Sequence, residues 1–172
     1  MPSAQLLPDV RSAVAADIDH LATIWFDGWH EAHAHLMPAA LTRVRTFASF
    51  RERICAALPT VRVIGPAGDP RGLCIVQHDE LYQLFVSPRA RGTGAAAALI
   101  ADAERRLAGS GVDVAWLACG IGNDRAARFY GKAGWRNAGV MLNRVETAAG
   151  EFAVDVWRFE KRVHGMERRA DE

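Results

Sequence analysis

Residues 84–96 read Leu84-Phe85-Val86-Ser87-Pro88-Arg89-Ala90-Arg91-Gly92-Thr93-Gly94-Ala95-Ala96. An apolar run typical of a strand, 81–86, enters this stretch, and an alanine- and leucine-rich run typical of a helix, 94–108, leaves it. Gly92 and Gly94 lack a Cβ, so the backbone between the two runs can curl tightly. Such a turn brings free N–H groups and the positive end of a helix dipole to one point. It therefore predicts a site for an anion such as pyrophosphate.

The composition fits one folded domain. The chain has 172 residues, half of them hydrophobic, which is enough for a full core. We expect a single domain at 1–165 and a charged tail at 166–172. The formal net charge of +1 gives no general attraction to nucleic acid or to a membrane. No apolar run approaches the ~20 residues of a membrane span.

The N-terminal sequence and the cysteines indicate the cellular compartment. The chain does not open with a basic segment followed by an apolar one, so we expect no signal peptide. Its three cysteines are scattered and include no Cys-x-x-Cys pair. Reduced, scattered thiols predict a cytoplasmic protein. The net charge near zero and the lack of an apolar span predict that it binds neither nucleic acid nor a membrane.

The segments before the turn predict a mixture of strands and helices. Asp17 can cap a helix whose apolar residues recur every 3.6 positions through Trp25 and Trp29. Pro38 is expected to open a turn. The expected elements are a strand at 10–15, helices at 17–32 and 46–58, and strands at 60–64, 72–78 and 79–86.

The segments after the turn predict a crossover and a terminal hairpin. The helix at 94–108 has one apolar face and an opposite face with Asp102 and Glu104. A mostly apolar strand at 112–118 follows, and the order strand, helix, strand implies a parallel pair with a right-handed crossover. The remaining expected elements are a short helix at 123–134 and strands at 136–147 and 152–161.

Two motifs together resemble one family. The segment Arg89-Ala90-Arg91-Gly92-Thr93-Gly94 resembles the acyl-CoA-binding pattern Q/R-x-x-G-x-G/A of the GNAT (GCN5-related N-acetyltransferase) superfamily. Residues 123–135, Asn123-Asp124-Arg125-Ala126-Ala127-Arg128-Phe129-Tyr130-Gly131-Lys132-Ala133-Gly134-Trp135, resemble its second motif, N-x-x-A-x-x-x-Y-x-x-x-G-F, with Trp135 in place of Phe. A phosphate-binding P-loop would need Gly-Lys-Ser/Thr, whereas Ala95 follows Gly94 here.

The resemblance implies a fold and a reaction. The fold class is α+β (mixed α/β): a single GNAT-like domain with a central, mostly antiparallel twisted sheet of about seven strands. It also includes a parallel pair at the cofactor cleft and about four helices. The reaction is direct transfer of the acetyl group of acetyl-CoA to an amine, without a metal. The cofactor-binding residues that the resemblance implies are Leu84, Phe85, Val86, Arg91, Gly92, Thr93, Gly94, Ala95, Ala96 and Asn123.

The resemblance also implies two catalytic residues. Tyr130 matches the family's general acid, which protonates the departing thiolate; otherwise it only lines the thiol channel. Asn123 matches a residue that bonds the pantetheine arm, or else is a plain helix cap. Glu80 resembles the strand glutamate that serves as general base in histone-type enzymes. Period-two geometry would place it on one face with Tyr82, Leu84 and Val86.

The general base stays open. His78 and Asp79 are reserve candidates, deprotonation relayed by water needs no single residue, and Glu80 at a strand start is often merely solvated. Some N-terminal-amine acetyltransferases of the family carry a base at the position of Ala118, which cannot act. This counts against that subclass.

The acceptor is the least determined partner. Trp25, Trp29 and His30 are candidates for the wall of a substrate pocket, with plain core packing as the alternative. No acid or cysteine completes a metal-ligand spacing with the nearby histidines, so no metal is expected. A small-molecule amine is the leading acceptor. A protein lysine or N-terminus, or a non-catalytic acyl-CoA sensor, are the alternatives, and a homodimer remains an option because dimers are common in the superfamily.

Overall fold

The computed structural model describes residues 9–164. The predicted tail at 166–172 and the first eight residues of the predicted domain lie outside the described part. The described elements are β1 (Val10–Ser12), α1 (Ile18–His33), α2 (Ala39–Val44), α3 (Phe47–Ala57), β2 (Val61–Ile64), β3 (Gly72–Gln77), β4 (Glu80–Val86), α4 (Ala95–Gly109), β5 (Val114–Gly120), α5 (Asp124–Lys132), β6 (Arg136–Thr147) and β7 (Gly150–Arg162).

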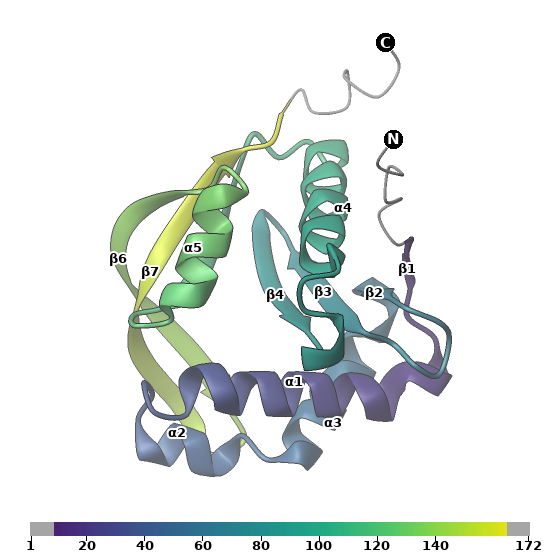
Figure 1. Ribbon diagram of the computed structural model, residues 1–172. Coiled ribbons are helices and arrows are strands. Elements are labelled where there is room, and N and C mark those ends of the chain that lie inside the picture. The colour runs from purple at the N-terminus through teal and green to yellow at the C-terminus, as the bar shows by residue number, and fades with distance from the viewer. Residues whose placement is uncertain (1–8, 165–172) are drawn as a thin grey trace.

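The seven strands form one sheet in the order β1-β2-β3-β4-β5-β7-β6 (Figure 1). Every neighbouring pair is antiparallel except β4 and β5, which are parallel. The predicted fold class is confirmed, including its parallel pair. The short helix α2 was not predicted. The sequence analysis expected a turn at Pro38, whereas this proline directly precedes the first residue of the helix.

The parallel strands β4 and β5 meet at one end and then diverge. Glu80 is in register with Trp116, and the Trp116 N–H donates to the Asp79 carbonyl at 3.1 Å. The register records no further pair between these strands in the described chain. Because β3 and β7 hold the outer edges of the two strands, the sheet opens toward Val86 and Gly120.

A bulge in β4 changes which side chains share a face. Ile75 pairs with Gln83, and the next residue of β3, Val76, pairs with Leu81, so Tyr82 is the extra residue. Leu84 packs with the α4 side of the sheet, whereas Tyr82 packs with the α1 side. The predicted common face for Glu80, Tyr82, Leu84 and Val86 is therefore wrong, because a bulge shifts the period of two by one residue.

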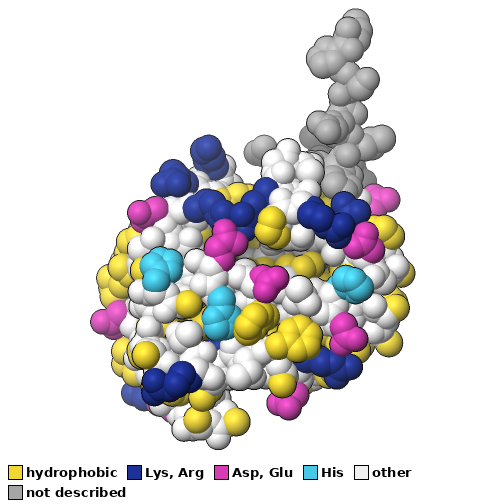
Figure 2. Space-filling model, turned by 60° about the horizontal axis from the view of Figure 1, so that its bottom comes forward, with side chains coloured by type: hydrophobic (Ala, Val, Ile, Leu, Met, Phe, Trp, Pro, Cys, Tyr) yellow, Lys and Arg dark blue, Asp and Glu magenta, His cyan; other side chains and the backbone are white. Residues whose placement is uncertain are grey.

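Helices cover both faces of the sheet. Leu99 and Leu107 of α4 are fully buried in one core, to which α5 contributes partly buried residues. Leu21 of α1 and Phe50 of α3 are fully buried in the core on the other face. Figure 2 turns the α1 side toward the viewer and shows basic and acidic side chains interspersed over it. The two cores leave the opening between β4 and β5 flanked by α1 on one face and by α4 and α5 on the other.

The polar face predicted for α4 is partly buried. Asp102 and Glu104 are 7% and 4% exposed, and both carboxylates have cationic partners. Arg62 Nη2 lies 3.3 Å from Asp102 Oδ1, and Lys161 Nζ lies 2.9 Å from Glu104 Oε1. The indole N–H of Trp135 also donates to Glu104 Oε1 at 2.9 Å. Buried charge is tolerated here because it is paired, and it ties α4 to the sheet and to the end of α5.

Asp17 anchors the chain before α1 instead of capping that helix through its side chain. Its carboxylate is fully buried and accepts hydrogen bonds from the Arg11 guanidinium and from the N–H groups of Val14 and Gly68, at 2.8–2.9 Å. Burial alone would raise the pKa of Asp17, but these donors outweigh it and lower the pKa to about 2. The carboxylate thereby holds the entry to α1 against β1 and the β2–β3 turn.

Candidate active site

A cavity of about 440 Å³ lies at the open end of the sheet, between α1, the end of β4 and α5. Nine of the ten predicted cofactor residues line it, together with Tyr130. The nine are Leu84, Phe85, Val86, Arg91, Gly92, Gly94, Ala95, Ala96 and Asn123. Thr93 does not line it, because its hydroxyl turns back to the Ala90 carbonyl. A Cβ on Gly28 of α1 would come within 2.6 Å of the Phe85 ring, so α1 can approach β4 closely only without a side chain there.

The glycine turn provides free donors. Gly92 and Gly94 have φ of 75° and 85°, the left-handed region that L side chains rarely adopt. In the described chain, the N–H groups of Ala95, Ala96 and Ala97 have no hydrogen-bond partner. The predicted donors at Arg91 and Thr93 instead bond to the carbonyls of Pro88 and Ala90, both at 3.3 Å. The free N–H groups of Ala95 to Ala97 lie at the N-terminus of α4, a position that favours an anion.

Two arginines at the rim of this cavity share one acid. Arg91 Nη2 lies 2.7 Å from Glu31 Oε2, and Arg125 Nη1 lies 3.6 Å from Glu31 Oε1. The hydrogen bond from Arg91 is the main cause that lowers the pKa of Glu31. All three side chains are partly solvent-exposed, so the ion pairs are weak and can exchange for another anion.

Tyr130 lines both the cavity of about 440 Å³ and a narrower space. A narrow space of about 70 Å³ is lined by Tyr130, Asn123 and Cys119 on one side and by Tyr82 and Leu84 on the other. Burial raises the pKa of Tyr130 above its ordinary value and keeps the hydroxyl protonated at neutral pH. Asn123 Oδ1 accepts a hydrogen bond from the Ala126 N–H at 3.4 Å, so this residue caps α5 and also lines both spaces.

A second cavity, of about 410 Å³, lies on the α1 side of the sheet. Its walls come from α1, α2, α3 and from strands β3 to β7. Glu80 lines it, and burial, followed by repulsion from Asp79, raises the pKa of Glu80 to about 7, although Arg158 opposes this shift. A carboxyl with such a pKa can take and release a proton near neutral pH. Tyr82, Gln83 and Ala118 line both this cavity and the narrow space, so the narrow space shares lining residues with each of the two larger cavities.

Of the three residues predicted to bind the acceptor, only one lines the second cavity. Trp29 lines the second cavity. Trp25 does not: it is 1% exposed and packs in the core, with its ring centroid 5.3 Å from that of Phe50. His30 does not line the cavity either; its Nε2 lies 2.7 Å from the Arg45 carbonyl oxygen and fixes that backbone. The helical period places Trp25 and Trp29 on one face of α1, but only Trp29 lines the cavity.

Several lining residues were not among the predicted site residues: His33, Arg45, Arg53 and Tyr82. His33 follows Trp29 by one helical turn, which is a sequence signal for the same face of α1. Burial lowers the pKa of His33 to about 4, so its ring is neutral. A Cβ on Gly120 would come within 3.0 Å of this ring, so a larger residue at this end of β5 would push against His33. No sequence pattern indicated Arg45 and Arg53, because they reach the cavity only through the packing of α2 and α3 against the rest of the fold.

Comparison with known proteins identifies the family. The model of the acetyltransferase (GNAT) family matches residues 19–135. The chain belongs to this family. It is 35% identical over 99 residues to an uncharacterized N-acetyltransferase of Mycobacterium bovis, a match that covers 55% of this chain and 60% of that protein. The match therefore spans less than two thirds of the relative's length. The N-acetyltransferase class predicted from the two motifs is confirmed at family level.

Solved structures agree with the fold. A GCN5-related N-acetyltransferase from Rhodopseudomonas palustris has a TM-score of 0.69 at 18% identity, covering 92% of this chain and 98% of that chain. A PaiA N-acetyltransferase from Thermoplasma acidophilum, solved in complex with coenzyme A, has a TM-score of 0.68 at 14% identity, covering 90% and 98%. Among residues 9–164, no helix has the length and apolar character to cross a membrane. The same residues contain no group of three His, Cys, Asp or Glu placed to hold a metal ion.

Proposed function

We propose that this protein transfers the acetyl group of acetyl-CoA directly to a primary amine of a small molecule. The observation that carries the proposal is that the narrow space shares lining residues with each of the two larger cavities. We call the cavity of about 440 Å³ the outer cavity and the cavity of about 410 Å³ the inner cavity. Tyr130 lines the outer cavity and the narrow space, and Tyr82 lines the narrow space and the inner cavity. Donor and acceptor can therefore enter from opposite faces and meet beside β4, which is the arrangement that a direct transfer needs.

The outer cavity suits acetyl-CoA. The free N–H groups of Ala95 to Ala97 and the positive end of α4 favour its pyrophosphate, and Gly92 and Gly94 leave room for the backbone to approach it. Bound acetyl-CoA supplies an activated thioester. Where β4 leaves β5, backbone N–H groups of Leu84–Val86 are candidates to stabilise negative charge on the carbonyl oxygen. The solved relative that holds coenzyme A is consistent with this assignment.

Two side chains serve proton transfer in this proposal. Tyr130 stays protonated at neutral pH and donates its proton to the departing thiolate sulfur. Glu80, with a pKa of about 7, accepts a proton from the incoming ammonium and so frees the lone pair that attacks. Tyr130 lines the narrow space and Glu80 lines the inner cavity. Protonation of the thiolate and deprotonation of the amine therefore take place at separate groups.

The inner cavity favours a small acceptor over a peptide. Its volume of about 410 Å³ lies in the range of small-molecule sites. The β6–β7 hairpin contributes Val145, Val154 and Val156 to its wall, opposite Trp29 and Leu41 of the helical side. An extended peptide needs an open groove, whereas these walls close around the cavity from two sides.

The test is a two-stage assay. Calorimetric titration measures whether acetyl-CoA binds, and thiol release is then followed with a panel of small amines and of lysine or N-terminal peptides. Acetyl-CoA binding with thiol release that depends on a small amine is expected. Binding without release by any acceptor would favour an acyl-CoA sensor, and release only with peptides would favour a protein acetyltransferase.

A further inference from the structure

Two arginines in the inner cavity lack carboxylate partners. Arg45 directly follows α2, is 6% exposed and lines the cavity; Arg53 comes from α3 and lines the same cavity. Neither forms an ion pair within residues 9–164. The buried arginine-contacting acids elsewhere, Asp17 and Asp102, show that this chain otherwise pairs buried charge. The cavity therefore concentrates positive charge that the fold does not neutralise.

The guanidinium group of Arg53 is held in place, and both arginines have a donor without a partner in the described chain. Arg53 stacks 4.1 Å over the Trp25 ring and donates from Nη2 to the Tyr82 hydroxyl at 2.9 Å, while its buried Nη1 has no partner in the described chain. The buried Nε of Arg45 likewise has none. The contact of His30 Nε2 with the Arg45 carbonyl fixes the backbone of Arg45. Ordered, unpaired donors of this kind favour binding of a planar oxyanion.

The electrostatic environment of Arg45 agrees with this geometry. Burial, followed by repulsion from Arg53, lowers the pKa of Arg45 to about 10, and the only opposing group is the Tyr82 hydroxyl. Leaving a buried charge unpaired costs stability, so a cavity that keeps the buried Arg45 beside the half-buried Arg53, both without a carboxylate partner, favours an anionic partner from outside the chain.

The same cavity is also lined by an acid, Glu80. Glu80 precedes Tyr82 by two residues in β4, which corresponds to about 7 Å along a strand. Tyr82 in turn contacts Arg53. The cavity thus has a proton-accepting end at Glu80 and a cationic end at Arg45 and Arg53. A molecule with an amine and an anion a few bonds apart matches both ends.

We propose that the acceptor is an amino carboxylate, whose carboxylate binds Arg45 and Arg53 while its amine faces Glu80. This rests on the proposed function and names its acceptor class. A carboxylate is favoured because its two oxygens match the planar guanidinium fork. The remaining lining charges, Arg144 and Glu146, are exposed on β6, and Arg144 pairs with Glu151 at 2.7 Å, so neither is an equivalent partner.

The experiment compares matched acceptors with and without the carboxylate. Phenylalanine is paired with phenethylamine, ornithine with putrescine, lysine with cadaverine, and O-phosphoethanolamine is added as a phosphate-bearing amine. Thiol release from acetyl-CoA gives kcat/KM for each. We expect at least one amino acid to exceed its decarboxylated partner by tenfold or more. Equal or higher activity of the decarboxylated amines throughout, or of the phosphate-bearing amine over every amino acid, would overturn the proposal.

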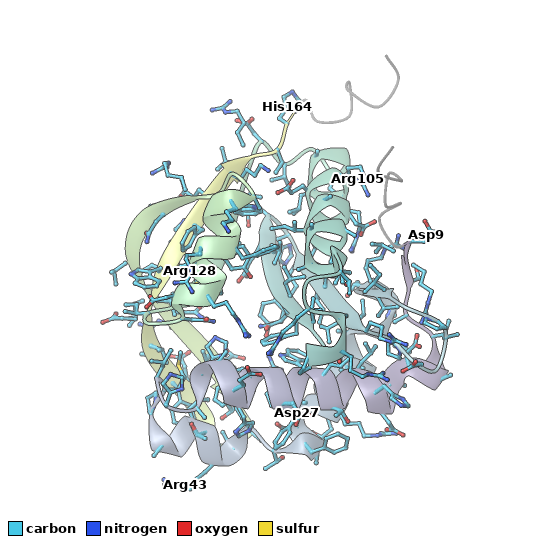
Figure 3. All side chains as sticks on the ribbon, viewed as in Figure 1. Asp9, Asp27, Arg43, Arg105, Arg128 and His164 are labelled. Carbon is cyan, nitrogen blue, oxygen red and sulfur yellow. The ribbon has the colours of Figure 1, made fainter. Side chains whose placement is uncertain are left out.

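Variants then test the arginines. Arg45→Met and Arg53→Gln should raise the acceptor KM at least tenfold and abolish the carboxylate preference, with the KM for acetyl-CoA changed less than twofold. Arg43→Gln is the matched control, because Arg43 is exposed on the outer side of α2 and does not line the cavity (Figure 3). Arg45→Lys keeps the charge and should retain part of the preference. A carboxylate preference that survives Arg45→Met would overturn the assignment.

Thermal unfolding separates a binding role from a structural one. Because Arg45 is a buried unpaired charge, Arg45→Met should unfold at an equal or higher temperature than the wild type while it loses the preference. A lower unfolding temperature with unchanged preference would show a structural arginine and contradict the proposal. Failure of the proposed function would look different, since acetyl-CoA would then not bind or would release no thiol with any amine.

Discussion

The outer cavity, which we propose for acetyl-CoA and call the cofactor cavity, and the inner cavity, which we propose for the amine and call the acceptor cavity, are similar in size but are built in different ways. The cofactor cavity takes most of its lining from two continuous segments, 84–97 and 123–130, each a turn followed by a helix. The acceptor cavity takes its lining from three helices and five strands. A short motif can therefore specify the first cavity, whereas the second exists only after the whole sheet and its helices have assembled.

The two cavities also differ in chemistry. The cofactor cavity presents backbone N–H groups at a helix N-terminus, which bind an anion largely independently of side-chain identity. The acceptor cavity presents side chains whose pKa values burial has shifted: Glu80 upward, His33 and Arg45 downward. The proposed cofactor site thus depends on backbone geometry, and the proposed acceptor site depends on the electrostatics of burial.

The largest effect is expected for Tyr130, which should separate turnover from acetyl-CoA affinity. Tyr130→Phe removes one hydroxyl and keeps the ring that packs near Trp135 and Phe159. Loss of a general acid should lower kcat about 10²–10⁴-fold. The dissociation constant of acetyl-CoA should change less than about twofold, because the pyrophosphate site is untouched. Steady-state rates and calorimetry on the same preparation measure both, and wild-type turnover would mean that solvent protonates the thiolate.

Glu80 tests the acceptor side through pH. As a base with a pKa of about 7, it acts in its ionised form, so the wild-type rate should rise through about pH 7 to a plateau. Glu80→Gln should lower the neutral-pH rate about 10²-fold and lose this limb. The gap should narrow at high pH, where the acceptor carries its own free amine. Superimposable pH–rate profiles would remove Glu80 from the reaction.

Stability gives a second reading of Glu80 that does not depend on activity. Because folding raises the pKa of Glu80, its contribution to stability is complete below the unfolded-state pKa and is lost as pH rises through about 7. The neutral Glu80→Gln variant escapes this loss. It should be more stable than the wild type above pH 7, by about 1–2 kcal/mol once partial exposure of the carboxyl is considered. Thermal unfolding at pH 5.5 and pH 8.5 measures the change, and a gain of the same size at both pH values would contradict the raised pKa.

Gly94 tests the cofactor side through charge. Gly94→Asp places a negative side chain at the N-terminus of α4 and should weaken acetyl-CoA binding about tenfold to a hundredfold. Gly94→Asn is the matched control, since Asn has the same shape and also tolerates the left-handed backbone found there. Calorimetric titration of both folded variants separates charge from strain. Equal affinities for the Asp and Asn variants would place the pyrophosphate elsewhere.

The smallest expected effect concerns Glu31, which holds two rim arginines of the cofactor cavity. Glu31→Gln frees Arg91 and Arg125 for the anionic donor and should tighten acetyl-CoA binding about twofold to fivefold at low salt. The gain should fade at high salt. Asp27→Asn is the control, because Asp27 is exposed one turn earlier on α1 (Figure 3). Weaker binding by Glu31→Gln would mean that the ion pairs position the rim for the donor.

The sequence alone determined the features whose causes are local. The glycine turn, the alanine-rich helix behind it, the Asn123 cap and the strand order around the crossover follow from residue type, period and chirality. They sufficed for the resemblance to the family, which implied the fold class and ten cofactor residues, nine of which line the cofactor cavity. Backbone N–H groups at a helix start depend on few residues, so a short motif carries them.

Only the tertiary structure decided what is set by burial and by register. The bulge at Tyr82 reversed the expected face of Leu84 and Val86, and a period of two contains no sign of an inserted residue. Trp25 and Trp29 look alike in sequence, yet one is core and the other lines a cavity. The unpaired state of Arg45 depends on which acids other segments bring near it. Such distances are fixed by packing between elements far apart in the chain, which local pattern does not encode.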